Sequence, residues 1–287
     1  MFEPRIQHFH DEPTGTLSYV VDDGTSGRAA VIDCVLGYDA RSGRTDTAPT
    51  DVIIEYLRGH DLEPEWILET HAHADHLSGA QYLKAELGGS VAIGEGIRAV
   101  QAHFAPIYNL DDRFTPDGSQ FDQLFADGDV FRIGELSCEV LATPGHTDDS
   151  VSYRIGNAVF VGDSLFMPDF GTARCDFPGG DAGRLYDSIR RLLALPDDTR
   201  LYMCHDYQPG GRELRWSCTV AEQRAQNVHV HDGVSRRDFT RMRTERDAGL
   251  TLPALIIPSI QVNIRAGHLP EAEANGIAFI KVPIDTF

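Results

Sequence analysis

The stretch ETHAHADHLSG, residues 69–79, decides how this sequence is interpreted. It contains four side chains that commonly bind metal ions: His71, His73, Asp75 and His76. An apolar run, residues 66–68, precedes the stretch, and residues 77–87 carry apolar side chains at roughly helical spacing. The polar group therefore falls where a strand is predicted to end and a helix to begin, and it predicts a metal site there.

Three further predicted strands each end in a side chain of the same chemical type. TPGHTDDS places His146 after LSCEVLAT, VFVGDSLF places Asp163 at the end of an apolar run, and LYMCHDY places His205 after RLYMC. A buried, unpaired carboxylate at Asp163 would be costly. Imidazole and carboxylate together suit zinc, iron or manganese. We therefore expect four strand ends to present metal ligands at one rim of the fold.

The spacing His-x-His alone is weak evidence, because the chain contains it twice. His229 and His231 in NVHVHDG repeat the spacing of His71 and His73. No further ligand-type side chains accompany the second pair at strand ends. We therefore expect His229 and His231 to lie at the surface or to support the site without binding metal.

Composition limits the class of protein and its partners. The 287 residues are 41% hydrophobic, which allows a sizeable core, and the formal net charge is −19. Such a charge repels phosphate backbones, so no nucleic-acid partner is expected, and an anionic substrate must be bound by a few local arginines. No apolar run is long enough for a membrane helix, and the polar N-terminus lacks signal-peptide features, which predicts a cytoplasmic protein without a membrane partner. The five cysteines are scattered, odd in number and without a Cys-x-x-Cys pair, which is typical of reduced thiols.

The order of predicted elements indicates an α/β fold. Strand-like runs occur in two blocks with helices between them, which predicts a sandwich of sheets covered by helices. Residues 37–49 and 111–128 are polar or rich in Asp and Gly, and we expect loops there. Residues 1–220 are predicted to form the catalytic domain, and residues 221–287 a C-terminal extension that packs on the same domain.

The full set of motifs resembles the metallo-β-lactamase superfamily over about residues 15–210. The resemblance rests on His71-Ala-His73-Ala-Asp75-His76, Gly-His146-Thr, Gly-Asp163 and Cys-His205-Asp. It implies an αββα sandwich with the metal site at one edge of the two sheets. In the binuclear hydrolases of this superfamily, His71, His73 and His146 would hold one metal. Asp75, His76 and His205 would hold the second, with Asp163 bridging.

Further segments resemble the persulfide dioxygenase family more than glyoxalase II. CHDYQP, GTARCDFPGG and PSIQVNIRAG are similar to that family's Ala-His-Asp-Tyr, Gly-Arg-Thr-Asp-Phe and Pro-Ala-Asn-Met-Arg-x-Gly segments. This resemblance implies one Fe(II) per chain, with zinc possible in the purified protein, held by His71, His146 and Asp163. It implies that His73, Asp75, His76 and His205 orient these ligands. The implied activity is oxidation of glutathione persulfide with O2 to sulfite and glutathione, as in sulfide detoxification.

Three side chains are candidates for substrate binding. Arg174 follows Asp163 closely, and Arg265 lies in PSIQVNIRAG, so each could pair with a substrate carboxylate. The alternative for both is a structural role in bracing loops. Tyr207, two residues after His205, could donate a hydrogen bond at the same rim, or it could be a core residue.

Other functions stay open at this point. The main alternative is a zinc-dependent hydroxyacylglutathione hydrolase of the glyoxalase II kind. A metal-binding or sulfide-sensing protein without catalytic activity needs fewer ligands than the chain offers, and a true β-lactamase would leave the dioxygenase-like segments unexplained. A homodimer is possible.

Overall fold

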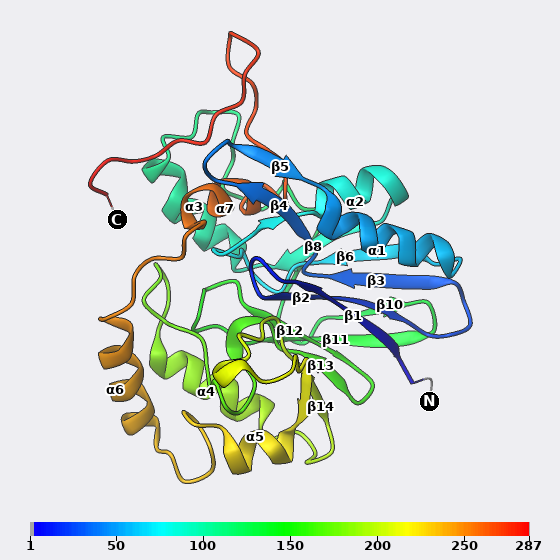
Figure 1. Ribbon diagram of the computed structural model, residues 1–287, viewed down its shortest axis with the longest axis vertical. Helices are drawn as coiled ribbons and strands as arrows, with labels where there is room; N and C mark the ends of the chain where they lie inside the picture. Colours follow the sequence, from blue (N-terminus) through cyan, green and yellow to red (C-terminus); the bar gives the residue numbers. More distant parts are fainter. Residues whose placement is uncertain (1–2, 287) are drawn as a thin grey trace.

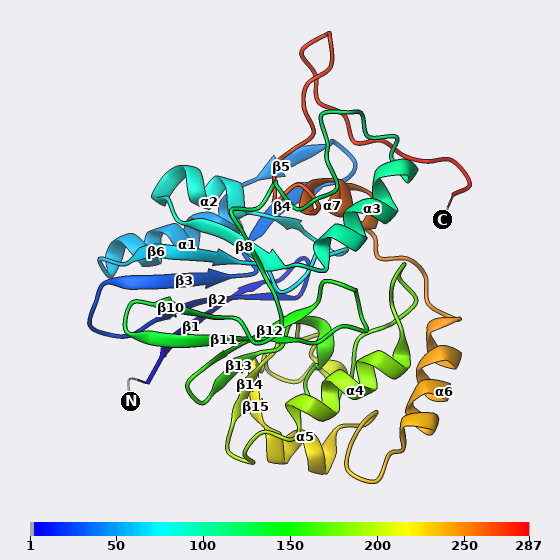
Figure 2. The ribbon, with the colours of Figure 1, turned by 180° about the vertical axis from the view of Figure 1, so that it is seen from behind.

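Two six-stranded sheets lie face to face, with helices on both outer sides (Figures 1 and 2). This arrangement is seen in a computed structural model that describes residues 3–286. The αββα sandwich predicted from the sequence is therefore confirmed. Buried apolar clusters lie between the sheets and between each sheet and its helices.

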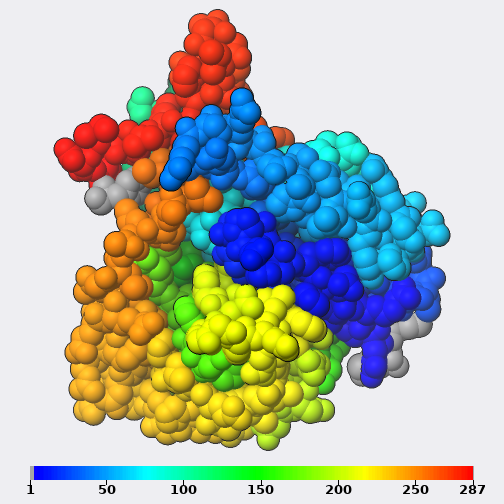
Figure 3. All heavy atoms as spheres, in the orientation of Figure 1, coloured from blue at the N-terminus to red at the C-terminus, as the bar shows by residue number. Residues whose placement is uncertain are grey.

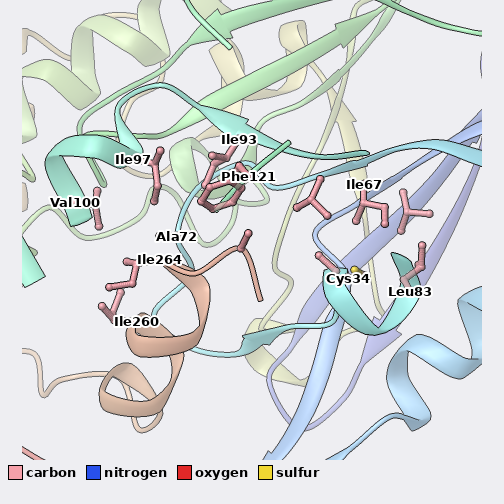
Figure 4. Packing of buried hydrophobic residues seen from close by; sticks show 14 of the residues in the cluster. Cys34, Ile67, Ala72, Leu83, Ile93, Ile97, Val100, Phe121, Ile260 and Ile264 are labelled. Carbon is pink, nitrogen blue, oxygen red and sulfur yellow. The ribbon is translucent and has the colours of Figure 1, made fainter. Parts of the chain in front are cut away.

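The first sheet has the order β1-β2-β3-β6-β8-β9. Its strands are Arg5–Asp11, Thr16–Asp22, Arg28–Ile32, Glu63–Leu68, Ser90–Gly94 and Gln123–Phe125. Four helices accompany this half of the molecule: α1 (Ala48–Gly59), α2 (Ala80–Leu87), α3 (Ile97–Ile107) and α7 (Ile256–Asn263). One buried cluster joins the sheet to these helices, and Figure 4 shows Ile67 of β6 with residues of α2, α3 and α7.

The second sheet has the order β10-β11-β12-β13-β14-β15. Its strands are Val130–Ile133, Leu136–Ala142, Val151–Ile155, Ala158–Phe160, Arg200–Tyr202 and Ser217–Thr219. The helices of this half are α4 (Ala182–Leu192), α5 (Val220–Gln226) and α6 (Arg236–Asp247). A short 3₁₀ turn, η1 (Gly162–Ser164), follows β13, and η2 (Pro209–Gly211) follows β14.

A small third sheet corrects two of our sequence expectations. Residues 37–49 were expected to form a loop, but they contribute to a hairpin of β4 (Val35–Asp39) and β5 (Arg44–Asp46). The strand β7 (Leu77–Ser78) pairs with β4, so the helix expected over residues 77–87 begins only at Ala80. Likewise, β9 lies inside the expected loop of residues 111–128.

The two large sheets meet at the edge where their strands end. Thr16 forms a bridge with His205, and the backbone N–H of Leu17 donates to Cys204 O at 2.7 Å. The hydroxyl of Tyr19 on β2 donates to Met203 O. These contacts hold the segment after β14 against β2, so side chains that follow strands of both sheets can reach a common point.

The C-terminal segment contacts both halves of the sandwich. Helix α6 packs on α4, and α7 lies against β7. Residues 268–286 form an arm without helix or strand, drawn in red in Figure 1. The division into domains at residue 220 stays a prediction. Among residues 3–286 no helix is long and apolar enough to cross a membrane.

Candidate metal centre

Hydrogen bonds behind His71 determine which of its ring nitrogens faces the centre. Thr70 Oγ1 donates to Asp33 Oδ2 at 2.9 Å, so this hydroxyl accepts from His71 Nδ1 at 3.0 Å. The proton of neutral His71 therefore lies on Nδ1, and Nε2 keeps its lone pair. Burial lowers the pKa of His71 well below its usual value, which keeps the ring neutral.

His73 is held by two buried carboxylates. Its Nε2 lies 3.0 Å from Asp33 Oδ1 and 3.5 Å from Glu69 Oε2. Burial alone would lower the pKa of His73, but these two carboxylates raise it. Because Nε2 carries the proton that Asp33 accepts, Nδ1 is the ring nitrogen left for another contact. Asp33 itself has a φ of 52°, a left-handed conformation that Asp tolerates better than most residues.

His146 reaches the centre from the loop after β11. Its Nδ1 donates to Arg174 O at 2.7 Å, which leaves the lone pair on Nε2. The loop is fixed against α4: a Cβ at Gly145, whose φ is 139°, would lie 2.3 Å from Leu185 N. Only glycine allows this approach, so the position of His146 depends on it.

Asp163, in the turn after β13, lies among the histidines. Its carboxylate oxygens are 3.9 Å from His71 Nε2, 3.7 Å from His146 Nε2 and 3.5 Å from His205 Nε2. His205 Nε2 also lies 3.2 Å from Asp75 Oδ2. His76 completes the group, with its Nδ1 3.2 Å from Leu77 O.

The donor atoms fit a metal site. Several donor atoms at the centre are buried and have no hydrogen-bond partner among the described residues: His71 Nε2, His73 Nδ1, Asp75 Oδ2, His76 Nε2, Asp163 Oδ1 and both ring nitrogens of His205. Burying so many unpaired polar atoms would cost several kcal/mol, about 1–3 for each, unless a cation satisfies them. Ligand atoms of His71, His146 and Asp163 lie within 4.8 Å of one another, as do those of His73, Asp75 and His76. The structure thus brings the predicted side chains together, and it offers donors for one metal ion or two.

The charge states of the remaining donors suit a cation. Burial is the main cause that lowers the pKa of His76 to about 4, so its ring is neutral near pH 7. Although burial opposes it, the neighbouring His205 and His76 lower the pKa of Asp75 to about 2, which keeps this carboxylate charged. Neutral imidazole and ionised carboxylate are the forms that bind metal.

Asn263, at the end of α7, fixes the loop that carries His73 and His76. Its Nδ2 donates to His73 O and His76 O, both at 2.8 Å, and its Oδ1 accepts from Ser78 N at 2.8 Å. All of these groups are buried. A residue almost two hundred positions downstream therefore fixes the backbone of the loop that carries His73 and His76.

A pocket of about 310 Å³ opens from the centre. Its walls include Asp75, His146 and Asp163 from the centre, aromatic rings of Phe166, Phe170, Phe177 and Tyr207, and the cations Arg174 and Arg246. In Figure 3 a recess with green residues lies between the orange C-terminal segment and the yellow loop that follows β14. A second pocket on the side of His76 is lined by the β4–β5 hairpin.

Of the three predicted substrate-binding residues, Arg174 and Tyr207 line the pocket that opens from the centre, and Arg265 does not. Tyr207 stacks on His205, with ring centroids 5.5 Å apart. Arg174 is in the pocket wall, but its guanidinium donates to Asp176 and to Thr251 O, so most of its hydrogen-bonding capacity is used. Arg265 lies apart, 4.8 Å above the ring of Phe114, in a different pocket.

The sequence interpretation missed several side chains that the structure places at or behind the centre. They are Asp33, Glu69, Arg246 and Asn263. Asp33 carried a usable signal, because it is an acid directly after an apolar strand, like Asp163. Asn263 and Arg246 carried none, because their contacts depend on how the C-terminal helices pack.

Known proteins are similar to this chain in sequence and in fold. Residues 11–205 match the family model of the metallo-beta-lactamase superfamily. A probable metallo-hydrolase of Burkholderia pseudomallei is 51% identical, covering 98% of this chain and 99% of the relative. Glyoxylase B2 of Dictyostelium discoideum is also 51% identical, covering 98% and 97%.

More distant matches carry a different name. The mitochondrial persulfide dioxygenase ETHE1 of Homo sapiens is 29% identical, covering 88% of this chain and 84% of the relative. The crystal structure of ETHE1 from Myxococcus xanthus superposes with a TM-score of 0.74 at 30% identity, covering 92% of this chain and all of that one.

Proposed function

Because the chain belongs to the metallo-β-lactamase superfamily, we propose that its centre binds one Fe(II) and oxidises glutathione persulfide with O2. At the coarser level the protein is a metal-dependent hydrolase or dioxygenase of this superfamily. In the proposed reaction one persulfide, one O2 and one water give one sulfite and one glutathione.

The observation that carries the proposal is the cluster of His71, His146 and Asp163, of which His146 and Asp163 line the pocket. Two imidazoles and one carboxylate form the donor set of many non-haem iron oxygenases, and they leave other positions open. Fe(II) held by these residues would supply binding positions for sulfur and O2 and electron transfer between them. The superposition on ETHE1 over the whole of its chain supports the same assignment.

The remaining side chains would orient these ligands and the substrate. Asp33, through Thr70, fixes the proton of His71 on Nδ1, and Arg174 O does the same for His146. The aromatic rings of Phe166, Phe170 and Phe177 make the pocket wall largely apolar. Such a wall excludes water from a polarisable sulfur atom and favours its contact with the centre.

A second candidate, a two-metal thioester hydrolase, is favoured by one specific feature. Asp75 Oδ2, His76 Nε2 and His205 Nε2 are buried without a hydrogen-bond partner among the described residues, as donors to a second metal ion would be. The names of the relatives at 51% identity agree with this alternative. In this reading Asp163 would bridge the two ions.

The two functions are separated by loading the protein with Fe(II) alone or with Zn(II) alone, under anaerobic conditions. O2 uptake and sulfite are then measured with glutathione persulfide, and thioester hydrolysis with S-lactoylglutathione. The proposal requires that the iron form consumes O2 and releases sulfite in equal amounts, and that the zinc form does not. Fast thioester hydrolysis by the zinc form, without O2 uptake by the iron form, would establish the alternative.

A further inference from the structure

The C-terminal segment forms one wall of the pocket that opens from the metal centre. His229, Arg246, Leu250 and Pro253 line it. His229 was expected to be a surface or supporting residue, and its neighbour His231 is indeed exposed. His229 instead is half-buried in the pocket wall, so its role needs a separate explanation.

The contacts of His229 define its tautomer. The backbone N–H of Thr172 donates to His229 Nδ1 at 3.1 Å, so Nδ1 carries no proton. Burial is the main cause that lowers the pKa of His229 to about 4, and the nearby Arg243 and Arg246 lower it further. The neutral ring therefore carries its proton on Nε2. No described residue accepts a hydrogen bond from this nitrogen, which makes it an available donor in the pocket.

The ring of His229 is also held in place. Gly171 has a φ of 104°, and a Cβ there would lie 2.1 Å from His229 Nδ1. Asn227 Oδ1 accepts from the backbone N–H of His229 at 2.9 Å, and Asn227 Nδ2 donates to Gly171 O at 3.1 Å. These contacts fix the turn against residues 171–172, so the Nε2 donor is pre-positioned.

Arg246 supplies a free cation in the same pocket wall as His229. Of the two arginines in the pocket wall, Arg174 is already neutralised by Asp176. Arg246 is exposed, and its guanidinium forms no hydrogen bond or ion pair with the described residues. In a chain of net charge −19, an arginine without a carboxylate partner at a pocket mouth is suited to an anionic ligand.

A buried ion pair sets the position of Arg246 on α6. Arg243 Nε donates to Asp247 Oδ1 at 2.8 Å, and both side chains are buried. Arg243 Nη1 also donates to Thr172 O at 3.1 Å, and Asp247 Oδ2 accepts from Cys175 N at 2.8 Å. The end of α6 is thereby attached to residues 172–175, of which Thr172, Ala173 and Arg174 line the same pocket. Arg246 therefore lies next to the pocket on a braced helix.

We propose that Arg246 and His229 form a carboxylate-binding subsite at the mouth of the pocket, specific for thiol-derived substrates that carry a carboxylate. The guanidinium pairs with the carboxylate, and the Nε2–H group of His229 donates a further hydrogen bond. The sulfur end of the same molecule then points to the metal centre. The subsite rests on the proposed function for the identity of the sulfur substrate.

The subsite is tested by direct binding, which does not depend on the reaction catalysed. Calorimetry measures the affinity of the metal-loaded protein for glutathione and for glutathione diethyl ester, which lacks free carboxylates. Arg246→Gln should weaken the binding of glutathione about tenfold and leave that of the diester unchanged, since the lost hydrogen bond joins two charged groups. Arg246→Lys should restore part of the affinity.

The matched control is Arg237→Gln, an exposed arginine of the same helix that does not line the pocket. It should bind both ligands as the wild type does. Equal affinities of the wild type and Arg246→Gln for glutathione, or equal losses for the acid and the diester, would overturn the subsite. If the iron form consumes no O2 while Arg246→Gln still loses glutathione affinity selectively, the dioxygenase proposal fails and the subsite stands.

Discussion

Asp33 organises the candidate ligands, although it belongs neither to the group of His71, His146 and Asp163 nor to that of His73, Asp75 and His76. It accepts from Thr70 N and Thr70 Oγ1, and it contacts His73 Nε2 at 3.0 Å. Through Thr70 it also fixes the tautomer of His71. A carboxylate behind metal-binding histidines raises their basicity and holds their rings, so its loss typically costs about 10–100-fold in metal affinity.

Asp33→Asn should therefore lower metal affinity by about 10–100-fold, as measured by competition with a chromophoric chelator. The substituted amide cannot accept from all three donors at once. Asp23→Asn is the control, because Asp23 is a buried carboxylate that accepts backbone N–H groups of Thr25, Ser26 and Glu135, at a turn away from the centre. If the Asp33→Asn protein bound metal with the affinity of the wild type, Asp33 would have no part in metal binding.

Tyr207 presents a hydroxyl to the pocket for which no described residue is a hydrogen-bond partner. Tyr207→Phe removes only this hydroxyl. We expect turnover or substrate affinity to fall about tenfold, which is about 1.4 kcal/mol, at unchanged metal content. Tyr186→Phe, which loses a bond to Val234 O outside the pocket, should leave the kinetics unchanged. Unaltered kinetics of Tyr207→Phe would make Tyr207 a packing residue.

Among the elements, α7 has the closest connection to the centre. Asn263→Ala would leave two carbonyls and one N–H of the ligand loop unpaired in a buried setting. At about 1 kcal/mol or more for each group, the free energy of unfolding should fall by about 2–4 kcal/mol, and metal affinity should fall with it. Denaturant titration measures the first and chelator competition the second.

Asn157→Ala is a suitable control for Asn263→Ala. Asn157 also donates from its amide to a backbone carbonyl, that of Asp198, but at an exposed turn. Its replacement should cost less than about 1 kcal/mol and leave metal affinity unchanged. If Asn263→Ala were no more destabilised than this control, α7 would not support the ligand loop.

Sequence patterns predicted the elements whose faces are apolar and missed those whose buried faces are polar. The strands that end before Thr143 and Asp163 were recognised from apolar runs. Helix α6 was not, because two of its three buried side chains are Arg243 and Asp247, which no apolar period detects. The same holds for the site. The candidate ligands follow predicted strand ends, but the part of the pocket wall formed by His229 and Arg246 depends on the buried Arg243–Asp247 ion pair, which only the packed structure reveals.

The whole molecule should depend on metal for part of its stability. Its two sheets meet where several buried donor atoms face one another without partners among the described residues. A metal present at about 100 times its Kd stabilises the folded state by about 2.7 kcal/mol. At roughly 2–4 °C for each kcal/mol, removing it should lower the Tm by about 5–10 °C.

Differential scanning calorimetry of protein before and after treatment with a chelator tests this dependence, with metal added back as the reversal. The His146→Ala protein is the control, because the loss of a ligand should remove most of the effect of the chelator. An identical Tm with and without metal would mean that the donor atoms are satisfied in another way.

The most direct test of the central claim compares His71→Ala with His76→Ala, measuring iron per chain and O2 uptake with glutathione persulfide for each. His71 belongs to the three-residue cluster proposed to hold the catalytic iron, whereas His76 belongs to the second group of donors. We expect His71→Ala to lose both iron and activity, and His76→Ala to keep most of its iron and to consume O2. Two metal ions per wild-type chain, with activity abolished in His76→Ala, would contradict the claim.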